Sequence, residues 1–245
     1  MPPFRGDGQK YPIFKWKHYQ PDIILLTVRW YLRYNLSFRD LVEMMGERGI
    51  SLSHTTIMRW VHQYGPELNK RIRKYLKRTN DSWRVDETYL KIKGEKMYLY
   101  RAVDSQGNTL DSYLSKKRDA KAAKRFLKKA LASCPVTKPR VITVDGDKAY
   151  PVAIRELKNE KSRPHGMPLL VKKHLNNMIE QDHRFIKKRI RNMLRFKSWR
   201  TATKMIAGIE AMHMVKKGQL KLREQSVKNQ INCLKLDSNR KLCPL

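Results

Sequence analysis

The stretch WRVDETYLKI, residues 83–92, has the composition of a β-strand but carries Asp86 near its middle. Burying a carboxylate in such a run is unfavourable unless it is paired or binds a metal ion. Two later acidic residues could share that ion. Asp145 ends the apolar run VITVD, and Glu180 lies on the helix-like stretch NNMIEQDHRFIKK. The sequence therefore predicts one metal site built from these three carboxylates.

The chain carries far more positive than negative charge. Its 245 residues include 54 Lys and Arg against 22 Asp and Glu, which gives a formal net charge of +32. An excess of this size predicts strong, salt-dependent attraction to a polyanion, and we expect a nucleic acid such as double-stranded DNA as the partner. A ribosomal or histone-like binder would share this composition, so the charge by itself says nothing about catalysis.

The start of the chain and its cysteines favour a cytoplasmic protein associated with the nucleoid. Residues 1–12 lack the apolar core of a signal peptide, and the apolar run 23–32 is interrupted by a charge and too short to span a bilayer. Cys134, Cys233 and Cys243 lie too far apart to form a zinc or redox pair. We expect reduced thiols and no membrane partner.

Four segments are expected along the chain. Residues 1–20 form an N-terminal arm, and residues 21–78 form a helical domain. After Asn80 the sequence becomes rich in β-branched and aromatic residues, which marks a mixed α/β domain over residues 79–220. Residues 221–245 form a basic C-terminal tail.

The helical domain has the pattern of a helix-turn-helix. Its second helix is expected to begin at Ser37, and Asp40 completes a capping-box sequence. Gly49 suits the left-handed position of a turn, and Ser51 or Ser53 can cap a third helix. A helix, a short turn with glycine and a second helix are typical of DNA-binding proteins, although a plain helical hairpin has the same pattern.

The third helix would enter the major groove of DNA. Its apolar face is expected to be Ile57, Trp60, Val61 and Tyr64, with Trp60 in the core rather than stacked on a base. The outward residues at its start are candidates for contacting base edges or phosphates. They are Ser53, His54, Thr55, Met58, Arg59 and His62.

The second domain alternates strand-like and helix-like segments. Residues 83–114 read as three strands with turns at 93–95 and 105–108. Helix 119–133, strand 140–145, helix 150–160, strand 168–174, helix 175–195 and a last helix at 201–220 follow. This order predicts a mixed sheet with flanking helices, which makes the whole chain an α/β protein with a helical N-terminal domain.

Asp145 is expected where ligands bind in such sheets. It follows a buried strand and precedes Gly146, and ligands bind at the carboxyl ends of strands in open α/β sheets. If the strand of Asp86 is a neighbour, the two carboxylates can reach a common ion. Spacing alone leaves other acidic residues available, of which Asp147 is the closest rival to Asp145. They are Asp104, Asp111, Asp147, Asp182 and Glu210.

The helix that carries Glu180 has two adjacent stripes. One is apolar except for a histidine, for which we favour a core role over a contact with the metal site: Ile179, His183, Ile186, Ile190 and Met193. The other is charged, with steps of four, three and four residues: Glu180, Arg184, Lys187 and Arg191. Glu180 thus borders the buried face and can reach the sheet, and we expect the three basic residues to contact DNA.

Three clustered carboxylates suit Mg²⁺ or Mn²⁺, which prefer oxygen ligands and keep positions open for water and phosphate. Two such ions can activate an attacking oxygen and stabilise a leaving oxygen in phosphoryl transfer. This chemistry would explain why a highly basic protein keeps acidic residues together, since they would otherwise repel DNA.

Four blocks of the sequence resemble transposases of the insertion-sequence-six family. The blocks are SFRDLVEMMGERGISLSHTTIMRWVHQY, WRVDETYLKIKG with MYLYRAVDSQGNTLD, ITVDGDKAYP, and LNNMIEQDHRFIKKR. The likeness runs from about residue 20 to about residue 220, and the 34 residues from 146 to 179 that separate Asp145 and Glu180 match the family's spacing. Lys96 departs from the pattern, because tryptophan is frequent at that position.

The resemblance implies an RNase H-like catalytic domain in which Asp86, Asp145 and Glu180 bind the metal ions. It also implies a basic residue seven positions after the glutamate, here Lys187. It further implies a helix-turn-helix that recognises terminal inverted repeats, and replicative transposition by 3′-end nicking, strand transfer and cointegrate formation. Because such a reaction brings two element ends to a target DNA, we expect a homo-oligomer.

Two other functions share these features. One is a helix-turn-helix regulator whose RNase H-like domain is catalytically silent. The other is a structure-selective RNase H-like nuclease, which would cut a nucleic acid without joining the product to a second DNA.

Overall fold

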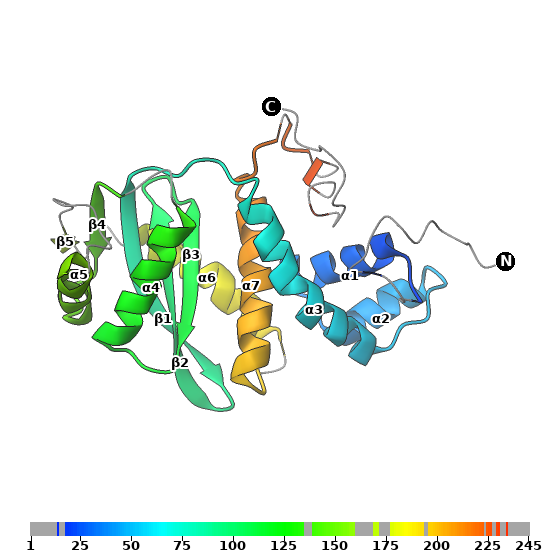
Figure 1. The fold of residues 1–245 in the computed structure, drawn as a ribbon. Helices are drawn as coiled ribbons and strands as arrows, with labels where there is room; N and C mark the ends of the chain where they lie inside the picture. The colour runs from blue at the N-terminus through cyan, green and yellow to red at the C-terminus, as the bar shows by residue number, and fades with distance from the viewer. Residues whose placement is uncertain are drawn as a thin grey trace. The chain divides into compact units, whose positions relative to one another are not determined.

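The computed structural model describes residues 14, 18–134, 139–159, 169–171, 177–193, 196–222, 224–226, 229–230 and 234. The chain divides into two compact units (Figure 1). One unit is Arg78–Thr203, and the other combines Met1–Lys77 with Lys204–Leu245. No described helix has both the length and the apolar character that crossing a membrane would require.

The helical unit contains α1 (Pro21–Arg33), α2 (Phe38–Gly46) and α3 (His54–Arg73). The expected capping box at the start of α2 is confirmed, because the Ser37 hydroxyl accepts from the Asp40 N–H and the Asp40 carboxylate accepts from the Ser37 N–H. Ser53 caps α3 by accepting from the Thr56 N–H. The expected apolar face of α3, Ile57, Trp60, Val61 and Tyr64, is buried.

The compact units divide the chain differently from the expected domains. The sequence assigned residues 204–220 to the second domain, whereas in the structure they pack with the helical unit. They include most of α7 (Trp199–Lys216), and the chain after α7 pairs with the chain after α3 through a bridge between Leu76 and Leu220. The reason is that α7 is apolar on nearly all sides, so its own pattern does not reveal which core it joins.

A pair of glycines lets α7 approach the other helices of this unit. A Cβ added to Gly208 would lie 2.8 Å from Cδ1 of Leu32 in α1 and 3.0 Å from Cα of Gly65 in α3. Real Cβ atoms essentially never show the first distance, and the second is tighter than most real Cβ contacts, so a side chain at this position would force Leu32 or the helix backbone to shift.

We therefore expect Gly208→Ala to lower the free energy of unfolding of the helical unit by about 1–3 kcal/mol, because overpacking displaces backbone. Gly46→Ala is the matched control, since Gly46 is also helical and a Cβ there would meet nothing within 4 Å. Urea unfolding followed by circular dichroism measures both variants. Equal midpoints for the two variants would contradict the close approach at Gly208.

The second unit is built on a five-stranded mixed sheet in the order β3-β2-β1-β4-β5. β1 pairs antiparallel with β2 and β2 with β3, whereas β1–β4 and β4–β5 are parallel. The turn between β1 and β2 uses Lys93 (φ 55°) and Gly94 (φ 86°), as expected from the sequence. The strands are β1 (Ser82–Ile92), β2 (Glu95–Asp104), β3 (Thr109–Ser115), β4 (Val141–Val144) and β5 (Leu169–Val171).

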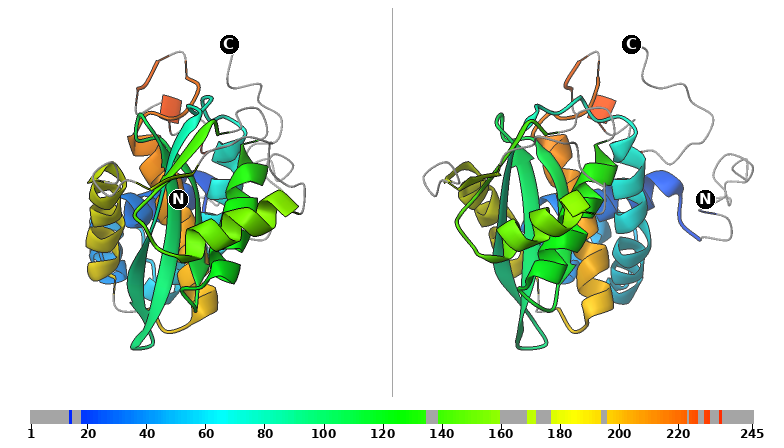
Figure 2. Two further views of the ribbon diagram at one scale, coloured as in Figure 1. Left: turned by 90° about the vertical axis from the view of Figure 1, so that its left-hand side faces the viewer. Right: turned by 60° about the vertical axis from the view of Figure 1, so that its left-hand side comes forward.

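Helices cover both faces of this sheet: α4 (Ala120–Ser133) and α5 (Ala149–Asn159) lie on one side and α6 (Asn177–Arg191) on the other (Figure 2). Successive strand residues alternate between the faces, so Trp83 and Val85 of β1 enter the core shared with α4 and α5. This sheet order with these helices is the RNase H-like, mixed α/β arrangement that the sequence predicts.

The buried stripe of α6 faces the sheet, as expected, with Ile179, His183 and Ile186 buried and Ile190 only half-buried. An ion pair adds to this packing. Nη2 of Arg101 in β2 lies 2.8 Å from Oδ2 of Asp182, and the Arg101 side chain is fully buried. This ion pair therefore ties the first turns of α6 to the centre of the sheet.

Candidate active site

The parallel register of β1 and β4 brings Asp86 and Asp145 together. Arg84 of β1 stands opposite Thr143 of β4, and continuing that register by two residues places Asp86 beside Asp145. Gly146 follows with φ 104°, a conformation that favours glycine, and turns the chain away from the strand. Asp145 is thus held at the carboxyl end of β4, where the sequence predicts it.

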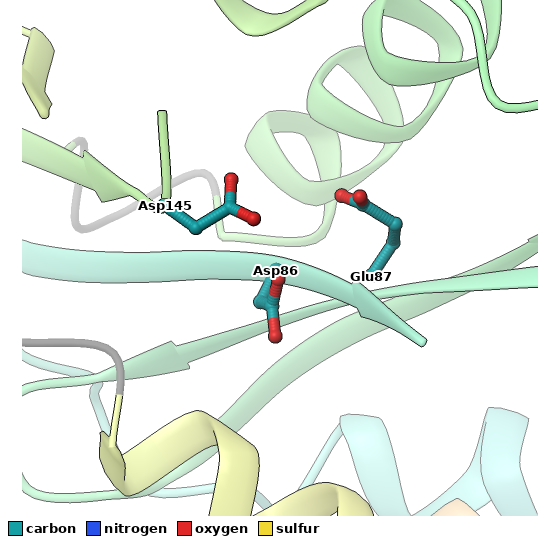
Figure 3. A group of neighbouring side chains, drawn as sticks. All are labelled: Asp86, Glu87 and Asp145. Carbon is teal, nitrogen blue, oxygen red and sulfur yellow. The ribbon is translucent and has the colours of Figure 1, made fainter. Parts of the chain in front are cut away.

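Asp86 and Asp145 lie close to the carboxylate of a third residue, Glu87. We call these three residues the carboxylate group. One oxygen from each of the three lies within 4.8 Å of the oxygens from the other two. Figure 3 shows that Asp86 points to the side of the sheet where α6 lies, whereas the carboxylate of Glu87 is on the side of α4 and α5. The sequence analysis missed Glu87, although it is the residue next to Asp86 in the stretch that predicted the site.

Glu87 is held by two other side chains. Nε of Arg118 donates to its Oε1 over 2.6 Å, and the Tyr150 hydroxyl donates to its Oε2 over 2.5 Å. Burial raises the pKa of Glu87, the Tyr150 hydrogen bond and the Arg118 charge act against that shift, and Asp86 and Asp145 add to it. Both oxygens of Glu87 are therefore already bound by the protein.

Asp86 makes its contact with α6. Nε2 of His183 lies 3.0 Å from Oδ2 of Asp86, and both side chains are buried. The burial of His183 agrees with the core role favoured from the sequence, and the residue also contacts Asp86 of the carboxylate group. Its position on the apolar stripe predicted the burial, but only the packing of α6 on β1 reveals the partner.

Three contacts show that α6 runs alongside β1 in the same direction. Arg84 Nη1 contacts Met178 Sδ at 3.0 Å, Asp86 contacts His183, and Lys187 Nζ lies 5.3 Å from the centroid of the Tyr89 ring.

Glu180 is exposed and precedes His183 by three residues, or about one turn of helix. The structure does not include Glu180 in the carboxylate group among the described residues.

Asp147 has a different environment from Asp145. The Asp147 carboxylate accepts from the Ala149 N–H at the start of α5 and lies 2.9 Å from Nη2 of Arg118. Its own N–H donates to Oδ1 of Asp145 over 3.1 Å. Asp147 therefore holds the loop between β4 and α5 in shape and orients Asp145.

The other acidic residues that spacing left open have partners in the fold or lie in the other unit. Asp104 is fully buried and accepts from two backbone N–H groups in the turn after β2 and from the Asn80 N–H before β1. Asp111 is buried and bound by Lys129, and Asp182 pairs with Arg101. Glu210 is buried in the helical unit.

The residues expected to contact DNA are mostly on the surface. On α3 and its cap, Ser53, His54, Thr55 and Arg59 are exposed, whereas Met58 and His62 are half-buried. Burial, with the nearby charge of Lys204, lowers the pKa of His62, which favours its neutral form. On α6 the expected basic stripe is exposed: Arg184, Lys187 and Arg191.

Comparisons with known proteins identify the family of this chain. A family model described as a DDE domain matches residues 80–219. The transposase for insertion sequence-like element IS431mec from Staphylococcus aureus is 40% identical over 205 residues, which cover 83% of this chain and 88% of that protein. The transposase for element IS257 in transposon Tn4003, also from Staphylococcus aureus, has the same identity and coverage.

A solved structure of the HTLV-2 integrase catalytic core domain in complex with magnesium is 16% identical, with a TM-score of 0.41, and covers 54% of this chain and 84% of that one. The family model and the transposase relatives decide the assignment, because they match more than half of the chain at substantial identity. The chain belongs to the DDE transposases of the insertion-sequence-six family.

Proposed function

We propose that this transposase binds the terminal inverted repeats of its own element, nicks their 3′ ends and joins the released hydroxyl groups to target DNA. The joining would be replicative and would give a cointegrate. The observation that carries the proposal is the approach of Asp86 and Asp145, whose carboxylate oxygens lie within 4.8 Å of each other at the junction of two parallel strands.

Asp86 and Asp145 fit a site for Mg²⁺ or Mn²⁺. Both supply hard oxygen ligands, and each keeps one carboxylate oxygen that accepts no hydrogen bond from the described residues. Two ions held there would activate the attacking oxygen and stabilise the leaving oxygen of a phosphodiester. His183 would orient the Asp86 carboxylate through its hydrogen bond, as outer partners of metal ligands do.

Glu180 is proposed as the third ligand in preference to Glu87. Because α6 runs alongside β1, Glu180 lies on α6 about one turn before His183, the residue that contacts Asp86. Its exposed side chain can change rotamer at little cost, because no packing holds it. Glu87 would instead have to share oxygens that already bind Arg118 and Tyr150.

The basic residues would bring DNA to this site. Lys187, Arg184 and Arg191 lie on the same stripe of α6 as Glu180, so they would hold phosphates next to the reacting bond. We propose that α2 and α3 form a helix-turn-helix whose outward residues, with Arg59 among them, read the inverted repeat. The active form would be a homo-oligomer, because two ends must be held together, and it would act in the cytoplasm on the nucleoid.

A joining assay tests the proposal. Linear DNA that ends in the sequences flanking this gene would be incubated with the protein and a circular target, in Mg²⁺, in Mn²⁺ or in EDTA. We expect 3′ nicks at the element ends and covalent donor–target products with either metal ion and none in EDTA.

The same assay distinguishes the two alternatives. Cleavage without donor–target products would indicate a nuclease. Binding of the ends with no nicked product under any condition would indicate a regulator with a silent catalytic domain. Either result would overturn the proposed strand transfer.

A further inference from the structure

Tyr89 of β1 is one of the few large, well exposed aromatic residues of the described chain, with 52% of its surface accessible, and two lysines lie near its ring. Nζ of Lys96 and Nζ of Lys187 each lie 5.3 Å from the centroid of its ring. We call Tyr89, Lys96 and Lys187 the Tyr89 cluster. Its lysines come from β2 and α6, so three elements meet at one ring.

The sheet register explains how the Tyr89 cluster forms beside the carboxylate group. Tyr89 stands opposite Tyr98, so Lys96 is its diagonal neighbour on the same face of the antiparallel pair. Lys187 follows His183 by four residues, one turn further along α6. Tyr89 follows Glu87 of the carboxylate group by two residues and stands on the same face of β1 as Glu87, about 7 Å along the strand, or roughly two base steps of DNA.

The positive charges of the lysines at the Tyr89 cluster are not balanced by nearby acidic partners among the described residues. Lys91 stands directly opposite Lys96 across the two strands, an arrangement of like charges that destabilises a sheet. Within the described ranges, neither Lys96 nor Lys187 forms an ion pair with an acidic residue. An anionic ligand would relieve this repulsion, and the exposed ring next to the lysines offers an apolar surface beside the anion.

We propose that the Tyr89 cluster binds an unpaired nucleotide of the DNA strand that passes through the active site. The base would stack on the Tyr89 ring, and Lys96 and Lys187 would hold the adjacent phosphates. The nucleotide must be unpaired, because a base inside a duplex is already stacked on both faces. This inference deepens the proposed transposase function, since it assigns the path of the strand beside the reacting phosphate.

Photocrosslinking without metal ions tests the cluster separately from the reaction. The full-length protein would bind duplex DNA with a short single-stranded 3′ extension that carries 5-iodouracil at successive positions, in EDTA. We expect a cross-link to the peptide that contains Tyr89 at one or two of these positions. Tyr89→Phe should keep the cross-link, whereas Tyr89→Leu should remove it and weaken binding of the extended DNA by about tenfold.

Tyr34→Leu is the control for Tyr89→Leu, and Lys121→Ala is the control for a further test variant, Lys96→Ala. Tyr34 is also exposed, at 45%, with Arg33 over its ring at 5.8 Å, so Tyr34→Leu should leave the cross-link to Tyr89 unchanged. Lys96→Ala should reduce the slope of log affinity against log salt by about one, because one phosphate contact is lost. Lys121→Ala, on the exposed side of α4, should leave that slope unchanged.

The outcomes separate this inference from the proposed function. If the wild-type protein joins DNA and the Tyr89→Leu variant gives the same cross-links as the wild type, the proposed function stands and the proposed nucleotide site at the Tyr89 cluster is overturned. A wild-type protein that gives the Tyr89 cross-link but no joined product would support the cluster as a DNA-binding site and overturn strand transfer. An absence of any cross-link to the Tyr89 peptide would also overturn the cluster.

Discussion

Asp86→Ala and Asp145→Ala are each expected to lower 3′ nicking and strand transfer by about 10³-fold or more, while binding of the element ends changes little. Metal-assisted stabilisation of charge in the transition state amounts to several kcal/mol, and each 1.36 kcal/mol is a factor of ten in rate. The two carboxylates meet at the junction of β1 and β4, so losing either removes part of the same site. Gel-based nicking and joining assays with a separate binding titration measure both effects.

A comparison of two Glu→Gln variants, at Glu180 and at Glu87, identifies the third carboxylate ligand of the metal site. Glu180→Gln should reduce strand transfer about as strongly as Asp86→Ala, whereas Glu87→Gln should reduce it less, because we assign Glu87 a positioning role beside Arg118 and Tyr150. Glu156→Gln is the control, since Glu156 is a half-exposed residue that pairs with Lys124 on the far side of the sheet from α6. A larger loss from Glu87→Gln than from Glu180→Gln would transfer the ligand assignment to Glu87.

Arg59→Ala is expected to have the opposite effect from the carboxylate variants, because it should weaken DNA binding and leave the chemical step intact. It should weaken binding of the element ends by about 1–3 kcal/mol if Arg59 contacts a base edge. At saturating DNA, nicking should return towards the wild-type rate, because the carboxylate group is unchanged. Unaltered end binding would remove Arg59 from the proposed recognition helix.

The second large effect is expected on stability. Asp182→Ala should lower the free energy of unfolding of the second unit by about 3–5 kcal/mol, because it removes the carboxylate that lies 2.8 Å from the fully buried guanidinium of Arg101. The double variant Arg101→Met with Asp182→Leu should recover most of this loss, since apolar residues of similar volume can replace a buried pair. Urea unfolding of the three proteins gives the comparison.

Two further observations make this test specific. Lys124→Ala, which breaks the more exposed pair between α4 and α5, should change stability by less than about 1 kcal/mol. The folded fraction of Asp182→Ala should also lose strand transfer, because Asp182 ties the turn of α6 next to Glu180 and His183 to the sheet. A loss of stability below about 1 kcal/mol would show that the pair does not anchor α6.

The sequence by itself determined the features that depend on neighbouring residues. Helix caps at Ser37 and Ser53, the turn at Gly94 and the buried stripe of α6 follow from local hydrogen bonding and side-chain periodicity. The strand ending at Asp145 was equally visible, because a short apolar run followed by glycine indicates where a buried strand stops. These local rules predicted the order of strands and helices along the chain.

Only the tertiary structure decided which distant residues meet. The parallel register of β1 and β4 placed Asp86 beside Asp145, and the contact between His183 and Asp86 required α6 to run alongside β1. The assignment of α7 to the helical unit and the meeting of Tyr89 with two lysines also depend on packing between separate elements. A helix or strand pattern records which face is buried but not what covers it, because that partner is chosen by contacts far apart in the chain.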